Sequence, residues 1–267
     1  MLEVMFERKE RLFEEWYVSK SFYKLDKFVE DMTQLYEIAG LTVAMDSFGR
    51  TRTQAEPYLI HKKESADIVI RSDWQALQKK QPHLSEEDSE YLMTGYSFYH
   101  QLLKFQGMLL HSSAVVRDGH AYLFTAPCCT GKSTHTRLWL ENFKDTFILN
   151  DDKPALRFED GRFYAYGTPW SGKYDNNRNI RVPLAGICVL RRGVDNKIEP
   201  YTGSAVLHDI LEQTVRPREP VLMGDLLELL DKLITSVPMW RLECNMEPEA
   251  AYTSYNAMSG KENKKCN

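Results

Sequence analysis

Residues 121–142 read AYLFTAPCCTGKSTHTRLWLEN, an apolar run followed by a short polar segment and then a helical pattern. The first five residues are typical of a buried strand, and the last ten place Leu138 and Trp139 near one helix face. The segment between them ends in Gly131-Lys132-Ser133 and fits the signature G-x-x-x-x-G-K-[ST], with alanine at the first glycine position. The pattern predicts a phosphate-binding loop, and the alternative is an ordinary strand–turn–helix unit.

Each part of such a loop has its own physical role. Backbone N–H groups of the loop and of the following helix point at phosphate oxygens. Lys132 would bridge the outer phosphates, and the Ser133 hydroxyl would hold Mg²⁺. ATP and Mg²⁺ are therefore the expected cofactors. The predicted nucleotide-binding residues are Ala126, Pro127, Cys128, Cys129, Thr130, Gly131, Lys132, Ser133 and Thr134.

A second strand is predicted over residues 146–150, and Asp151 and Asp152 follow it directly. Ligands in α/β proteins bind outside the carboxyl ends of strands, so this carboxylate pair can meet a metal on the nucleotide. Capping of a turn is the alternative role for the pair. Upstream, Asp118-Gly119 predicts a β-hairpin into the strand before the loop, so we expect a mixed sheet and an α/β (α+β mixed sheet) fold.

These segments together resemble a known family. The run His111-Ser112-Ser113-Ala114-Val115, the turn at 118–119, the loop and the aspartate pair resemble the core of the HPr kinase/phosphorylase family and, more broadly, of the phosphoenolpyruvate-carboxykinase-like superfamily. The block GTPWSGK at 167–173 resembles the small HPr-kinase-related proteins. The resemblance extends over about residues 36–258 and is specific over 111–191. It implies a P-loop kinase core of the HPr kinase type.

The resemblance also implies roles for individual residues. Asp151 would act as general base on an acceptor hydroxyl, Asp152 would bind Mg²⁺, and His111 would lie beneath the loop near these carboxylates. The expected function is ATP-dependent transfer of a phosphoryl group to a hydroxyl, by resemblance a serine of a protein or peptide, with a small metabolite as the alternative acceptor. A carboxykinase reaction is disfavoured, because the sequence offers no additional His/Lys metal pair.

The segment 167–173 contains Trp, Gly and Lys close to the predicted carboxylates, which suits closure over a substrate. Lys173 is accordingly a candidate catalytic residue that would contact phosphate or acceptor, with a surface lysine as the alternative. Arg178 and Arg181 follow on the same stretch and are weaker candidates for the same role. His135, on the first turn of the helix after the loop, is expected to be exposed.

The loop departs from the family pattern at Ala126 and Cys129, where glycine is usual. Glycine serves positions with positive φ, and a cysteine there costs roughly 1 kcal/mol or more. Either the loop takes a different shape or nucleotide binding is weakened, so a catalytically weak or inactive nucleotide-binding sensor is the second functional hypothesis. The adjacent thiols of Cys128 and Cys129 suggest redox sensitivity, with two small space-filling residues as the alternative.

Composition excludes several classes of protein. The 267 residues carry a net charge of −4, so no overall field favours nucleic acid or an acidic membrane surface. No apolar run approaches the roughly 18–20 residues that span a bilayer. The five cysteines are odd in number and fit no zinc-binding spacing. A cytoplasmic protein that binds neither nucleic acid nor membrane is expected.

The predicted organisation is an N-terminal helical appendage over 1–34, a single nucleotide-binding domain over 35–260 and a tail over 261–267. Local patterns predict a strand over 54–61 and a strand over 108–116. They also predict a helix that begins near the capping-box residue Ser85 and runs to about Gln106.

Overall fold

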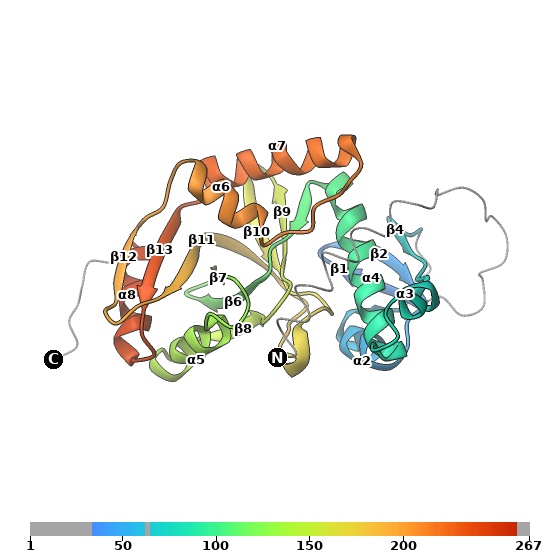
Figure 1. Cartoon of the computed structure of the whole chain (residues 1–267), viewed down its shortest axis with the longest axis horizontal. Coiled ribbons are helices and arrows are strands. Elements are labelled where there is room, and N and C mark those ends of the chain that lie inside the picture. The colour runs from blue at the N-terminus through green and yellow to red at the C-terminus, as the bar shows by residue number, and fades with distance from the viewer. Residues whose placement is uncertain (1–33, 62–64, 261–267) are drawn as a thin grey trace.

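The computed structural model describes residues 34–61 and 65–260, which form two β-sheets with helices packed on them (Figure 1). The smaller sheet has the strand order β3-β1-β2-β4. Its strands are β1 (Gln34–Ile38), β2 (Leu41–Met45), β3 (Leu59–Ile60) and β4 (Ile68–Ile70). The predicted N-terminal appendage, apart from Gln34, and the predicted tail lie outside the described residues.

The larger sheet has nine strands, in the order β5-β9-β10-β11-β7-β6-β8, with β13 paired to β11 and β12 paired to β13. Its strands are β5 (Gly107–Leu109), β6 (Ser112–Arg117), β7 (His120–Thr125), β8 (Phe147–Asn150), β9 (Ala155–Glu159), β10 (Arg162–Tyr166), β11 (Arg181–Arg192), β12 (Lys197–Pro200) and β13 (Met239–Cys244). Strand β11 runs parallel to β7 and β13, whereas β6 is antiparallel to β7 and β8. The predicted mixed α/β architecture is therefore confirmed.

Helices cover both faces of the larger sheet (Figure 1). The α-helices of the described residues are α2 (Gly49–Ala55), α3 (Trp74–Lys80), α4 (Glu86–Leu102), α5 (Lys132–Asn142), α6 (Ser204–Leu211), α7 (Pro220–Ser236) and α8 (Pro248–Met258). Alternation along β7 explains the two-sided cover, because successive side chains of a strand point to opposite faces. Ala121 and Leu123 join a core with α6 and α7, while Tyr122 and Phe124 join a core with α5 and α8.

The smaller sheet and α4 share a hydrophobic cluster with the larger sheet. Tyr36, Val43 and Phe98 belong to one hydrophobic cluster with Tyr164 and Trp170. Tyr164 lies in β10 of the larger sheet, and Trp170 lies in the segment that follows β10. A common core of this kind holds the two sheets together. The single domain over 35–260 stays a prediction.

Several local predictions can be compared directly with the structure. The hairpin at Asp118-Gly119 is confirmed, with φ of 50° and 73° at its two residues. The helix predicted from Ser85 is also confirmed. The Ser85 hydroxyl accepts a hydrogen bond from the Asp88 N–H at 3.0 Å, and left-handed Gln106 ends the helical segment. The strand predicted over 108–116 is interrupted at residues 110–111, between β5 and β6.

The strand predicted over 54–61 is wrong. Residues 49–55 form α2, a 3₁₀ turn follows over Glu56–Tyr58, and only Leu59–Ile60 pair as β3. Pro57 lies in the first turn of the 3₁₀ helix, where its missing N–H is not needed. Thr51 of α2 donates to Glu90 of α4, so contact between the two helices outweighs the local strand pattern.

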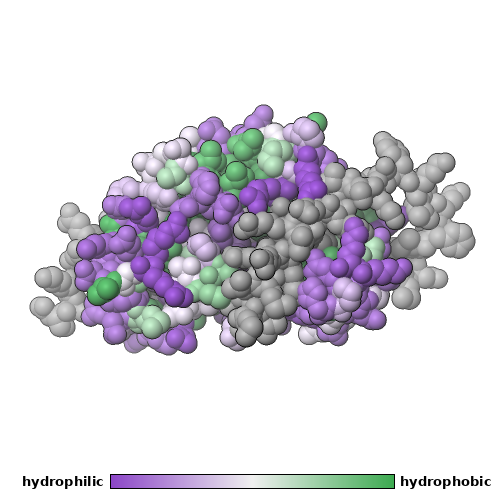
Figure 2. Space-filling view, viewed as in Figure 1, coloured by the Kyte–Doolittle hydropathy of each residue, from purple (hydrophilic) through white to green (hydrophobic). Residues whose placement is uncertain are grey.

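The surface of the described residues is largely hydrophilic in the view of Figure 2, with hydrophobic side chains gathered over α6 and α7. Exposed apolar residues on these helices are Leu207, Val221 and Leu227. Within the described ranges, none of the helices combines the length and the apolar character that crossing a bilayer requires.

Candidate functional site

Residues 126–131 connect β7 to α5, as the sequence predicts. Gly131 precedes the helix with a φ of 118°, and its carbonyl accepts the first helical bond from the His135 N–H at 2.9 Å. Cys129 has a φ of 60°. Cys129 therefore adopts the left-handed backbone that glycine would prefer, whereas Ala126 is buried and has no positive φ.

The outer side of this loop is open. A Cβ added at Gly131 would meet no atom within 4 Å, and Cys129 and Ser133 are exposed. The Lys132 ammonium folds back over the loop and donates to the Ala126 carbonyl at 2.9 Å. The space next to the Cα of Gly131 is therefore open, and the Lys132 ammonium is bonded to the loop itself.

Asp151 links the end of β8 to the start of α5. The Ser113 hydroxyl of β6 donates to its Oδ1 at 2.6 Å and lies 2.9 Å from the Thr136 hydroxyl of α5. The Ser133 hydroxyl is a second hydrogen-bond partner of this carboxylate. Burial raises the pKa of Asp151 above its usual value, although both serine hydroxyls oppose the shift. The Asp151 carboxylate therefore lies beside the first helical turn after the loop.

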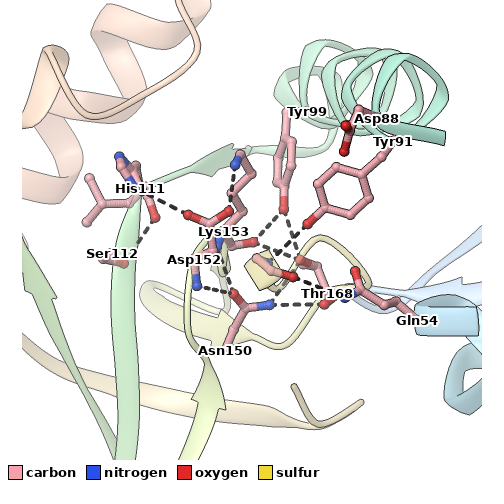
Figure 3. A network of polar contacts seen from close by, with 12 residues as sticks. Gln54, Asp88, Tyr91, Tyr99, His111, Ser112, Asn150, Asp152, Lys153 and Thr168 are labelled. Atoms are coloured by element: carbon pink, nitrogen blue, oxygen red, sulfur yellow. Dashed lines mark hydrogen bonds and ion pairs between the residues drawn. The ribbon is translucent and has the colours of Figure 1, made fainter. Parts of the chain in front are cut away.

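Asp152 contacts a different side chain through each of its carboxylate oxygens. Its Oδ1 lies 3.3 Å from His111 Nε2, and its Oδ2 lies 2.6 Å from Lys153 Nζ (Figure 3). Burial alone would raise the pKa of Asp152, but the Lys153 ammonium and His111 outweigh it and hold the pKa well below its usual value. Asp152 is therefore an ionised carboxylate with a partner on each oxygen.

His111 is fixed through its backbone at the break between β5 and β6. Its N–H donates to the Gln213 carbonyl at 2.7 Å, and its carbonyl accepts from the Thr125 hydroxyl at 2.8 Å. Thr125 is the last residue of β7, directly before the loop. The fold thus brings His111 to Asp152 and to the strand that leads into the loop.

A network of buried polar groups, which the sequence patterns did not predict, contacts the backbone of the segment 152–153 (Figure 3). The Asn150 side chain accepts from the Asp152 and Lys153 N–H groups at 3.0 and 2.7 Å and donates to the Thr168 carbonyl. The Tyr99 hydroxyl of α4 donates to the Lys153 carbonyl. The position of Lys153 directly after Asp151-Asp152 was the one available signal.

The segment 167–172 packs tightly beside this network. Trp170 is buried, stacks on Phe98 at a centroid distance of 4.9 Å, and donates to the Thr94 hydroxyl at 3.2 Å. The Gly172 N–H donates to the Tyr91 hydroxyl at 3.1 Å, and its carbonyl accepts from Gln54 at 3.1 Å. The Lys173 side chain lies outside what the structure describes, so its predicted contact with substrate stays a prediction.

The structure describes contacts of three further residues named from the sequence; for Arg178 and Arg181 the suggested contact with substrate stays a prediction. Arg178 places its guanidinium 4.1 Å from the centre of the Phe147 ring, and Arg181 lies 3.7 Å from the Tyr164 ring centre and pairs with Glu159. His135 is buried and contacts the Ser254 hydroxyl at 2.9 Å, so its expected exposure is wrong. Burial lowers the pKa of His135 to about 3, which makes it a neutral packing residue between α5 and α8.

Candidate metal ligands include Ser133 and Asp151, which are hydrogen-bonded to each other. Across residues 34–61 and 65–260, no three or more His, Cys, Asp or Glu side chains come together as a possible metal cluster. Mg²⁺ sites commonly use one or two protein oxygens together with substrate phosphates and water. Ser133 and the two aspartates are hard oxygen donors of this kind.

No family model and no curated protein matches the chain. Among solved structures, it is similar to the HPr(Ser) kinase/phosphatase from Coxiella burnetii, with a TM-score of 0.36 and 12% sequence identity. The alignment covers 58% of this chain and 99% of that chain. A structural similarity of this size carries no argument about activity, which is inferred below from the site itself.

Proposed function

We propose that the chain is a kinase-like phosphotransferase that binds ATP with Mg²⁺ at residues 126–134 and transfers the terminal phosphoryl group to a hydroxyl. One observation carries the proposal. Asp151, at the end of β8, shares hydrogen bonds with Ser113 and with Ser133 of the segment Gly131-Lys132-Ser133. A carboxylate pair therefore lies next to a strand–loop–helix unit whose open side could accept phosphates.

The residues present fit a nucleotide with its metal. The start of α5 offers backbone N–H groups to an anion, and the space beside Gly131 is open. Lys132 would leave the Ala126 carbonyl to contact the outer phosphates. When bound, the Mg²⁺–nucleotide complex supplies the phosphoryl group and neutralises charge on it.

The chain's own residues then have distinct roles. Asp151 would accept the proton of the acceptor hydroxyl, and Asp152 would hold the metal. His111 and Lys153 would fix the two oxygens of Asp152, and the Asn150 side chain would fix its backbone. Phosphoryl transfer depends chiefly on positioning and charge neutralisation, and these residues provide both.

A specific contact favours exchanging the two aspartates. Ser133, the expected metal ligand, is hydrogen-bonded to Asp151. In this second assignment Asp151 and Ser133 hold the metal together, and Asp152 with His111 accepts the proton. The two assignments predict opposite behaviour of the same pair of variants, so a single experiment separates them.

The acceptor is proposed from the family resemblance as a serine of a protein or peptide, with a small metabolite as the alternative. Two features favour a sensor that binds nucleotide without transferring phosphate. Cys129 occupies a left-handed position, and the Lys132 ammonium is bonded to the loop's own carbonyl. The experiment must therefore measure binding and transfer separately.

The test combines calorimetric titration of ATP, with and without Mg²⁺, and transfer from labelled ATP to a serine-peptide library and a cell extract. We expect Lys132→Ala to abolish binding, while Lys144→Ala, an exposed lysine beyond α5, binds as wild type does. The variant that lacks the general base should lose roughly 10²–10⁴-fold in turnover with little change in affinity. The variant that lacks the metal ligand should lose Mg²⁺-dependent binding.

The first assignment expects the turnover loss in Asp151→Asn and the binding loss in Asp152→Asn, and the second expects the reverse. Wild type that binds nothing at millimolar ATP would show that the loop assignment is wrong. Tight binding without transfer or hydrolysis would identify the sensor.

A further inference from the structure

We propose that Cys128 and Cys129 form a reversible oxidation site. Hydroperoxides would oxidise this pair of adjacent thiols to a disulfide, and the loop would then no longer bind an anion. The chemistry of the site stands by itself. Its effect on ligand binding rests on the function proposed above.

The two thiols are close together and reachable. Their sulfur atoms lie 3.5 Å apart, Cys129 is exposed and Cys128 is half-buried. An exposed thiol with a second thiol beside it is the arrangement that converts a first oxidation into a disulfide rather than into further oxidation. The pair therefore combines access for an oxidant with a resolving partner.

The other two cysteines of the described residues are less accessible and have no adjacent cysteine in the sequence. Cys188 is buried on β11, and Cys244 is half-buried on β13. Burial raises the pKa of Cys188 well above its usual value and that of Cys244 to about 11, which keeps both as unreactive thiols. Among these four cysteines, the pair in the loop therefore has the features of an oxidation site.

The reaction balances with a hydroperoxide as oxidant. One thiolate attacks the peroxide oxygen, the O–O bond breaks, and a sulfenic acid and water (or an alcohol) result. The second thiol attacks that sulfur, the S–O bond breaks, water leaves and the S–S bond forms. With hydrogen peroxide, the two thiols lose two electrons and two protons in total, and the peroxide is reduced to two waters. A dithiol reductant reverses the product by exchange.

Closing this ring must change the loop backbone. Adjacent Cα atoms are about 3.8 Å apart across a trans peptide, whereas disulfides usually join Cα atoms about 4.4–6.8 Å apart. Cys129 is part of this ring, its φ is 60°, and its carbonyl accepts a hydrogen bond from Arg192 at the end of β11. The N–H groups that would face a phosphate belong to the same few residues, so oxidation and anion binding compete for one backbone geometry.

The test uses the full chain and two independent measurements. Trypsin releases residues 118–132 as one peptide that contains only this pair of cysteines. After mild hydrogen peroxide treatment of the native protein, we expect this peptide to be lighter by two hydrogen atoms and to return to its original mass with dithiothreitol. Calorimetry should show at least about a tenfold loss of Mg²⁺–ATP affinity on oxidation, restored by the reductant.

Matched variants separate the site from general oxidation. Cys128→Ser and Cys129→Ser should lose the mass change, whereas Cys244→Ser should keep it together with the loss of affinity. Oxidation of Cys129 to sulfinic acid or to an intermolecular disulfide, without the ring, overturns the proposal. A disulfide between the two cysteines that leaves the affinity for Mg²⁺–ATP unchanged would also contradict the proposal. If reduced wild type binds no Mg²⁺–ATP, the proposed function fails, and the mass of the 118–132 peptide alone still decides whether the dithiol closes.

Discussion

Two loops flank the aspartate pair, and they differ in how much of their surroundings is filled. In the first, residues 126–131, an added Cβ at Gly131 would meet nothing within 4 Å. In the second, residues 167–172, an added Cβ at Gly167 would lie 2.0 Å from the Arg178 carbonyl oxygen, and one at Gly172 would lie 3.1 Å from Asp152. One loop keeps an open side beside the carboxylates, and the other is packed against them.

The difference shows that packing leaves no room for a side chain at Gly167, whereas packing sets no such limit at Gly131. Both loops end in a glycine that is followed directly by a lysine, Lys132 after the first and Lys173 after the second, so they look alike as sequence. The second is tied to α4 through buried Trp170 and through the bond from Gly172 to Tyr91. A loop held in this way positions Asp152 and is poorly suited to opening and closing.

The largest expected effect separates the two loops through matched glycine variants. Gly167→Ala places a methyl group against backbone that cannot yield, so we expect the free energy of unfolding to fall by about 3 kcal/mol or more. The methyl group of Gly131→Ala would contact no atom, so only the φ of 118° opposes the substitution. We expect the free energy of unfolding to fall by about 1–2 kcal/mol. Urea denaturation of both variants measures the difference. Equal losses would show that the loops do not differ in packing.

A smaller effect concerns Glu90, on the α4 surface that supports the second loop. Burial raises its pKa from 4.5 to about 7, despite the hydrogen bond from Thr51. The fold therefore favours the neutral acid. The stabilisation that this gives is complete below pH 4.5 and is lost as the pH rises through about 7.

Glu90→Gln stays neutral at every pH, so its free energy of unfolding should exceed that of wild type increasingly from pH 4.5 to above 7. The final difference should be about 2–3 kcal/mol. Urea unfolding at pH 4.5, 6 and 8 tests this, with Glu228→Gln, at an exposed glutamate of α7, as control. A difference that does not vary with pH would show that the pKa of Glu90 is the same in the folded and the unfolded protein.

The smallest expected effect concerns the first loop alone. Cys129→Gly removes the strain of a cysteine with a positive φ, but it also gives the unfolded chain more conformational freedom. We expect the free energy of unfolding to rise by about 0.5–1 kcal/mol in total. Cys128→Gly, at a residue without a positive φ, is the matched control and should destabilise. Thermal unfolding under reducing conditions compares the two. A loss of stability in Cys129→Gly would indicate that the thiol itself contributes packing that the φ value does not reveal.

The sequence alone determined the parts of the molecule that depend on neighbouring residues. The strand, loop and helix over 121–142 follow from hydrophobic periodicity and one glycine, and the hairpin at Asp118-Gly119 follows from local backbone preference. The placement of Asp151-Asp152 after a strand was predictable for the same reason. Each of these features requires only contacts within about 20 residues of chain.

Tertiary structure decided the rest. Residues 54–61 look like a strand by themselves, but contact between α2 and α4 makes the first part helical. His135 looks exposed on a first helical turn, but α8, more than 100 residues later, covers it. The pairing of Asp152 with His111 and Lys153, and of Asp151 with Ser113, also depends on which strands become neighbours in the larger sheet. Burial and pairing are set by segments distant in sequence, and no local pattern contains that information.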